Sequence, residues 1–338
     1  MQWTVAIGVD THKGQHVAVA FDVLGVELGS REIATTEAGY GELLGWAQGL
    51  GVPVFAVEGC GSYGAGLTRF LQLAGVVVWE CERPRRRDRR RGKSDLIDAA
   101  TAGRRLLAGE GLSVPRGGGR REELRLLLLE RRSAVRARTA ALNQLSALVV
   151  TGPAQVRARL EPLSGERLAR AAARQRSGPE VTAAVFRRLG RRVEHLSAEI
   201  GELERALTAL VAELAPALLG ESGVGPVCAA QLLVSSGDPK RLASEASFAA
   251  LAGTSPVEAS SGKQQRHRLN RGGDRQLSWA LHVIALQRVH HHAETAAYYE
   301  RLLAAGKTTK EAKRCVKRAL ARHFYHQLKG AQTHTLTT

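Results

Sequence analysis

The N-terminal third of the sequence is an ordered series of apolar strand-like and amphipathic helix-like segments. Three strand-like segments come first, and a helix, a strand, a helix, a strand and a helix follow. In order, they cover residues 3–9, 16–23, 26–35, 37–50, 53–59, 64–75, 76–80 and 94–109. Three meandering strands followed by α/β units predict an α/β domain in which helices pack on a mixed sheet.

Four acidic residues stand at the ends of these segments. Asp10 and Glu58 end the first and fourth strands, and Asp95 and Asp98 share one face of the last helix. The order of segments is that of the ribonuclease H-like fold, in which these two strands are neighbours. We therefore expect the four carboxylates to surround one or two divalent metal ions. Taken singly, each acid could instead cap a turn or complement a helix dipole.

The charge balance favours a polyanionic partner. The chain has 49 Lys and Arg against 32 Asp and Glu, a net charge of +17, which favours nucleic acid through counterion release. A basic stretch at 83–93 directly precedes Asp95, and a solvated loop is the ordinary interpretation of such a stretch. Its position predicts phosphate contacts instead, by Arg85, Arg86, Arg87, Arg89, Arg90, Arg91 and Lys93.

A second chemical candidate lies at residues 260–273. Ser260 and Ser261 precede a glycine, and a serine hydroxyl becomes a nucleophile when a base or metal activates it. Nearby cations could hold a phosphate and stabilise the transferred charge. They are Lys263, Arg266, Arg268 and Arg271. Taken alone, the segment reads as a polar glycine-containing loop.

The middle of the chain is expected to be helical after a Pro/Gly/Arg linker at 112–121. An apolar heptad pattern runs from 189 to 214 and predicts a coiled coil through which chains associate. Its positions are Leu189, Val193, Leu196, Ile200, Leu203, Leu207, Leu210 and Leu214. The alternative is an internal helical hairpin packed against 122–150.

The cysteine spacing and the hydropathy of the chain bear on metal binding, disulfides and cellular location. The four cysteines form no C-x-x-C pair, so we expect neither a zinc site nor a disulfide framework. No apolar run is long enough to span a membrane. We expect a cytoplasmic protein that associates with the nucleoid.

Three N-terminal motifs resemble those of a known family. "IGVDTHK", "VEGCGSYG" and "GKSDLIDA" are similar to the DEDD motifs of transposases of the insertion sequence one-ten family, which includes Piv-like DNA invertases. The C-terminal "GVGPVCAAQLL" and "FAALAGTSPVEASSG" resemble the second conserved domain of that family. The resemblance implies a RuvC-like DEDD catalytic domain at 1–111 and a helical coiled-coil region at 112–216. A mostly α-helical transposase domain at 217–330 and a tail at 331–338 would follow.

The resemblance also implies a chemistry. The four acids would bind Mg²⁺ (or Mn²⁺), and a serine would form a transient phosphoserine link during strand exchange. The distance from Pro256 favours Ser261, and the distance from Gly272 favours Ser260. The partners would be donor and target DNA, a structured guide RNA, and further copies of the chain in a dimer or tetramer with composite sites. Two alternatives are a RuvC-like nuclease that hydrolyses branched DNA with water, and a non-catalytic nucleic-acid-binding protein.

Overall fold

The computed structural model describes residues 3–81, 94–115, 119–176, 179–237, 242–260 and 267–330. The chain divides into two compact units. The first consists of Met1–Gly118 and Gly237–Leu242, and the second of Gly119–Ser236 and Ala243–Thr338.

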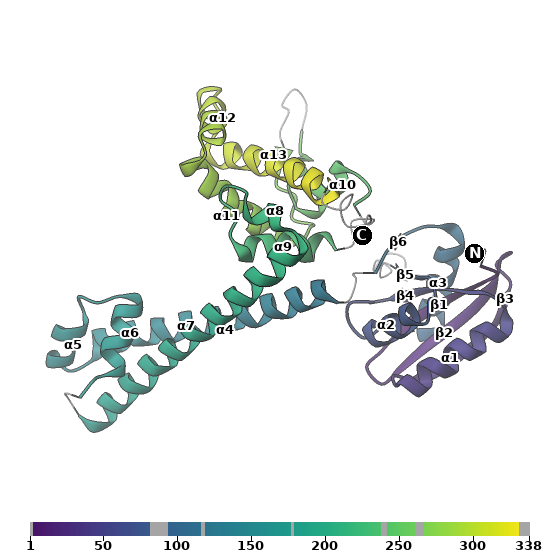
Figure 1. Ribbon diagram of the computed structural model, residues 1–338, viewed down its shortest axis with the longest axis horizontal. Helices are drawn as coiled ribbons and strands as arrows, with labels where there is room; N and C mark the ends of the chain where they lie inside the picture. Colours follow the sequence, from purple (N-terminus) through teal and green to yellow (C-terminus); the bar gives the residue numbers. More distant parts are fainter. Residues whose placement is uncertain are drawn as a thin grey trace. The chain divides into compact units, whose positions relative to one another are not determined.

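A six-stranded mixed sheet forms the centre of the first unit, with the strand order β3-β2-β1-β4-β5-β6 (Figure 1). The strands are β1 (Val5–Thr11), β2 (Gln15–Asp22), β3 (Glu27–Ala34), β4 (Pro53–Glu58), β5 (Val78–Cys81) and β6 (Leu112–Ser113). Strands β1, β2 and β3 form an antiparallel meander, and β4 and β5 extend the sheet parallel to β1. This mixed sheet fits the expected ribonuclease H-like arrangement.

One difference concerns the expected linker, whose first two residues form β6. This short strand pairs antiparallel with β5. Leu112 packs against the apolar cluster on the α3 face of the sheet, and the burial of its side chain stabilises β6 at the sheet edge.

Helices cover both faces of this sheet. On one face, α1 (Glu37–Leu50) and α2 (Ala65–Leu73) pack on a core that includes Val5, Ile7 and Val9. On the other face, α3 (Asp95–Ala108) packs on a core that includes Ala6. Successive residues of a strand point to opposite faces, so even-numbered residues of β1 point towards α3.

Helix α3 approaches β1 closely because both elements have glycine at the crossing. A Cβ atom on Gly8 would lie 2.1 Å from the carbonyl oxygen of Ala99 and 2.2 Å from the backbone nitrogen of Gly103. A Cβ atom on Gly103 would lie 2.6 Å from the ring of Phe21. Both glycines therefore fix where the first turn of α3 stands relative to the end of β1.

In the second unit, α4 (Arg120–Thr151) and α7 (Glu180–Leu214) run antiparallel (Figure 1). Two cross-helix ion pairs establish the direction, because the residue numbers rise on one helix and fall on the other. Arg120 pairs with Glu213 at 3.1 Å, and Arg131 with Glu204 at 2.6 Å. The short helices α5 (Ala154–Leu160) and α6 (Gly165–Ala173) connect them.

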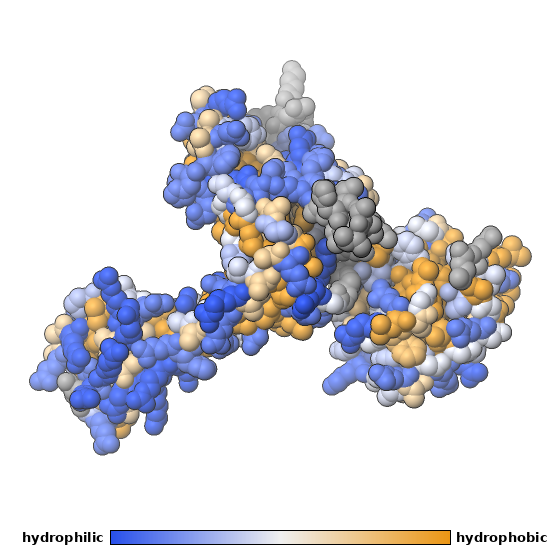
Figure 2. Space-filling view, in the orientation of Figure 1, coloured by the Kyte–Doolittle hydropathy of each residue, from blue (hydrophilic) through white to orange (hydrophobic). Residues whose placement is uncertain are grey.

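This hairpin accounts for the heptad pattern. Within one chain α4 and α6 pack along α7, and four of the eight heptad positions are buried: Val193, Ile200, Leu203 and Leu207. Hydrophilic residues cover most of the visible surface of the hairpin around α5 and α6 (Figure 2). The arrangement found is thus the internal hairpin, and an intermolecular coiled coil on the same stripe would have to displace α4.

The rest of the second unit is mostly helical, as expected. Its elements are α8 (Pro216–Leu219), α9 (Pro226–Ser236), α10 (Glu245–Leu251), β7 (Val257–Glu258), β8 (His267–Arg268), α11 (Arg275–His291), α12 (Ala293–Ala304) and α13 (Thr309–Gly330). Helix α9 packs against α4, α7 and α11, and α13 packs against α10, α11 and α12. Among the described helices, none is both long and apolar enough to cross a membrane.

A buried ion pair holds α11 in place. Arg288 is 6 % exposed, and its guanidinium donates to the carbonyl oxygen of Ser222 at 2.7 Å and pairs with Glu221. Burial by itself would raise the pKa of Glu221, but the nearby His323, Gln327 and Arg288 outweigh it and lower that pKa. The Glu221 side chain is therefore a carboxylate that contacts Arg288 of α11 and both His323 and Gln327 of α13.

Candidate metal centre

Asp10 and Glu58 lie at the carboxyl ends of two neighbouring parallel strands. The register pairs Val9 with Val57, so the two acids come next on β1 and β4. Both residues are buried, with Asp10 at 7 % and Glu58 at 9 % exposure. By strand alternation both belong to the face that α3 covers. The hydroxyl of Thr11 donates to the backbone carbonyl of Glu58 at 2.7 Å and ties the two strand ends together.

Asp95 and Asp98 lie on the first turn of α3, as the sequence predicts. Ser94 caps this helix, and its side chain accepts a hydrogen bond from the backbone nitrogen of Ile97. The cap fixes where the helix begins, and the Gly8–Gly103 crossing brings that beginning to the end of β1.

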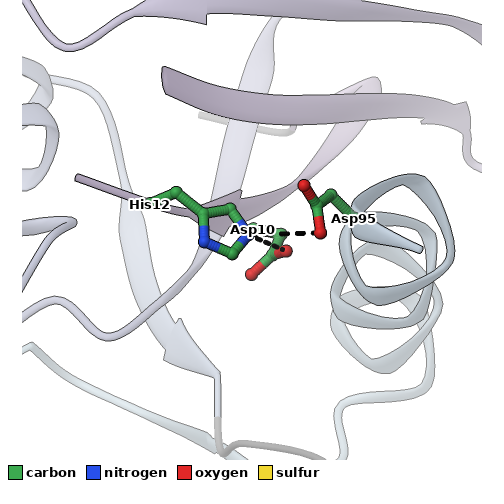
Figure 3. Close-up of side chains that lie close together, drawn as sticks. All are labelled: Asp10, His12 and Asp95. Carbon is green, nitrogen blue, oxygen red and sulfur yellow. Dashed lines mark hydrogen bonds and ion pairs between the residues drawn. The ribbon is translucent and has the colours of Figure 1, made fainter. Parts of the chain in front are cut away.

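His12 joins the two elements, and sequence reasoning did not single it out. Its Nε2 atom lies 3.1 Å from Oδ2 of Asp10 and 3.3 Å from Oδ1 of Asp95 (Figure 3). The possible ligand atoms of Asp10, His12 and Asp95 all lie within 4.8 Å of one another. A signal existed in the sequence, because a spacing of two along an extended chain places Asp10 and His12 on the same side.

The electrostatics of Asp10 indicate carboxylates that converge. Burial, the largest cause, raises the pKa of Asp10. His12 acts in the opposite direction, while the negative charges of Asp98 and Asp95 raise that pKa further. Asp98 is therefore close enough to act on Asp10, although Glu58 and Asp98 are not part of the three-residue group within 4.8 Å.

The remaining predicted site residues lie elsewhere or outside the described part of the chain. Ser260 is exposed and follows β7, and Arg268 is exposed on β8. Arg271 is exposed and lines a cleft at the start of α11. Ser261, Lys263 and Arg266 lie outside the described residues, as do Arg85, Arg86, Arg87, Arg89, Arg90, Arg91, Lys93 and the tail at 331–338.

The mixed sheet fits a ribonuclease H-like DEDD protein, and comparisons with known proteins agree. A family model described as "Transposase", of the DEDD type of IS110, matches residues 7–151. A second model, described as "Transposase IS116/IS110/IS902 family", matches residues 215–300. The two together match more than half of the chain.

A curated relative belongs to the same group. It is the insertion element IS110 uncharacterized 43.6 kDa protein of Streptomyces coelicolor, 36 % identical over 113 residues. The match covers 32 % of this chain and 28 % of that protein, well under two thirds of the relative's length. The chain belongs to the IS110 family of transposases.

Proposed function

We propose that this protein is a metal-dependent DNA transposase that cuts and rejoins strands through a serine. The observation that carries the proposal is the convergence of Asp10, His12 and Asp95 at one edge of the sheet, in a chain of net charge +17. Basic proteins attract phosphodiesters. A compact group of acidic residues in such a protein fits a binding site for a metal ion, which would contact the phosphate of the bound nucleic acid.

The donor set fits a divalent cation. Carboxylate oxygens suit Mg²⁺ and Mn²⁺, and an imidazole nitrogen is more acceptable to Mn²⁺. Asp10 and Asp95 would be the first ligands, with Glu58 and Asp98 completing the site from the same edge. When bound, the ion would polarise a phosphoryl oxygen and lower the pKa of the attacking hydroxyl. His12 would orient the two aspartates through its contacts with both of them.

The serine step would proceed by two displacements at phosphorus. Oγ of Ser261, or of Ser260, would bond to phosphorus while the bridging deoxyribose oxygen leaves and takes a proton. A hydroxyl of the new partner strand would then attack the phosphoserine ester, restore the serine and form the new phosphodiester. The exposure of Ser260 supports access to this segment.

A denaturing gel with labelled donor DNA, followed by peptide mapping of any adduct, tests this proposal. We expect an adduct in the wild type, none in Ser261→Ala, and loss of all strand cleavage in Asp10→Asn. An adduct on Ser260 would move the assignment by one residue. Full recombination by a Ser260/Ser261 double alanine variant would refute the serine mechanism.

The second candidate is a RuvC-like nuclease. The acidic cluster favours it because all of its members belong to the first unit, and water could replace the serine as nucleophile. Cleavage of branched DNA by the double alanine variant, with no adduct in the wild type, would identify this activity.

The proposed partners are donor and target DNA, a structured guide RNA and further copies of the chain, all acting at the nucleoid. The basic composition supports nucleic-acid partners. Full-rate recombination by RNA-free protein would exclude the guide. Sedimentation with and without nucleic acid gives the oligomeric state, which we expect to be a dimer or tetramer.

A further inference from the structure

A cleft of about 410 Å³ lies at the start of α11, inside the second unit. The segment after β8, the first turns of α11 and the middle of α13 line it. Its basic side chains are those of Arg271, Arg275, His282 and Lys317.

Among the described residues that line this cleft, Asp274 is the only acidic one, and its carboxylate is already hydrogen-bonded. One oxygen of Asp274 accepts hydrogen bonds from the backbone nitrogens of Gln276 and Leu277, at 2.8 and 3.2 Å. The other accepts from the hydroxyl of Ser235 on α9 at 2.6 Å. Asp274 therefore caps α11 and anchors it to α9, and the open side of the cleft is left with a positive lining.

Lys317 is the most enclosed of these cations. It is half-buried, burial lowers its pKa, and its Nζ atom donates to the hydroxyl of Ser278 at 2.9 Å. No carboxylate among the described residues forms an ion pair with it. Burial also lowers the pKa of His282, and the positive charges of Lys317 and Lys313 lower it further. Basic groups that face one another without a counter-charge are stabilised when an anion binds between them.

A large aromatic side chain stands at the same cleft. Trp279 is 44 % exposed and follows Arg275 by four residues, so both lie on one face of α11. A single exposed aromatic residue needs no explanation. An exposed indole beside several cations, however, is the arrangement that proteins use to stack an unpaired base next to a bound phosphate.

We propose that this cleft holds one backbone phosphate and the adjacent unpaired base of single-stranded nucleic acid. Lys317, Arg271 and Arg275 would bind the phosphate, and Trp279 would stack on the base. The proposal rests on the proposed function only in taking nucleic acid as the ligand. Strand β8 pairs with β7 and leads into the lining of the cleft, and Ser260 comes two residues after the end of β7.

Binding of short labelled single strands to the full-length protein, followed by fluorescence anisotropy in chelator, tests this proposal. Three probes of one sequence are used: DNA, the same DNA with abasic positions, and RNA. We expect Trp279→Ala to weaken binding at least about fivefold and Trp279→Phe to restore most of it. The difference between Trp279→Ala and wild type should vanish on the abasic strand, because no base remains to stack.

The charge arm uses Lys317→Gln, which keeps a hydrogen-bond donor for Ser278. It should reduce the slope of log affinity against log salt by about 0.7, the share of one phosphate on a single strand. Lys307→Gln, an exposed lysine in the turn before α13, makes the same change in net charge and should alter the slope much less. A larger loss on DNA than on RNA assigns the site to a DNA strand, and the reverse assigns it to RNA.

Wild-type affinity and salt dependence in both Trp279→Ala and Lys317→Gln, with unchanged circular dichroism and thermal unfolding, would overturn the proposal. That result would leave the metal-dependent function standing if Asp10→Asn still abolishes cleavage. Conversely, lost binding in the cleft variants together with cleavage that survives Asp10→Asn would overturn the proposed function and keep the cleft.

Discussion

Replacement of Gly8 by alanine should disturb the acidic site without touching any acidic residue. The new methyl group would lie 2.1 Å from the carbonyl oxygen of Ala99, whereas ordinary contact begins at 3.4 Å. Because the obstacle is backbone on α3, the helix must retreat by about 1 Å, and overpacking of this kind costs about 1–3 kcal/mol. Asp95 moves with the helix, so its carboxylate recedes from Asp10 and His12.

Two measurements check this reasoning. Urea unfolding should show a loss of about 1–3 kcal/mol in Gly8→Ala. Calorimetry with Mn²⁺ should show weakened binding in the fraction that remains folded. Gly45→Ala is the matched control, because nothing lies within 4 Å of a Cβ atom at this position in α1. It should gain about 0.5–1 kcal/mol through helix propensity and bind Mn²⁺ normally. If Gly8→Ala is as stable as the wild type and binds Mn²⁺ equally well, α3 does not set the site.

Three further outcomes are expected. Asp10→Asn should abolish strand cleavage and Mn²⁺ binding while single-strand affinity in chelator stays at the wild-type level, because removing a negative charge cannot weaken attraction for phosphate. Glu221→Gln should lower stability at neutral pH by about 2–4 kcal/mol in urea unfolding, since it leaves Arg288 buried without its counter-charge. The pKa of Glu221 is lowered from 4.5 in the folded protein, so this contribution is present above pH 4.5 and is lost as the pH falls below that value. Leu207→Ala should cost about 2–5 kcal/mol by opening a cavity between α7 and α4, and sedimentation should show the same oligomer as the wild type; dissociation without lost stability would restore the intermolecular coiled coil.

Much of the first unit could be predicted from sequence because its signals are local. The helix at 37–50 begins and ends where its apolar pattern does. Thr36 caps its first turn, and Gly51, which has a positive φ, follows its last residue. The positions of Asp10 and Glu58 at strand ends and of Asp95 and Asp98 on the first turn of α3 could be predicted from the order of the segments. The spacing of two places His12 beside Asp10, but its contact with Asp95 could not be predicted, because it depends on how near α3 comes to β1. Gly8 and Gly103 together set the distance between α3 and β1, and the sequence around either glycine alone does not indicate this contact.

The heptad pattern on α7 is a local signal that does not identify the partner helix. An apolar stripe on α7 specifies that something covers it, and the stripe is the same whether the cover is another chain or α4. What decides is the length of chain between the two helices, together with charge pairs such as Arg131 with Glu204, which match only in an antiparallel register. Such pairs are not visible as a period in one helix. The cleft beside Lys317 is likewise lined by residues of two separate helices, α11 and α13, and no local sequence pattern indicates that they meet.

The electrostatics of the acidic edge and of the cleft differ in a way that bears on how substrate is bound. Lys317, Arg271 and Arg275 would attract phosphate at any metal concentration, because their positive charge does not depend on a bound metal ion. Asp10, Asp95 and Asp98 would repel phosphate until a bound cation reversed the local charge. On the proposed function, a strand would be held by the second unit before the first unit is competent to cut it. Metal should accordingly act mainly on the cleavage step and little on binding of single strands, which follows from the charges alone.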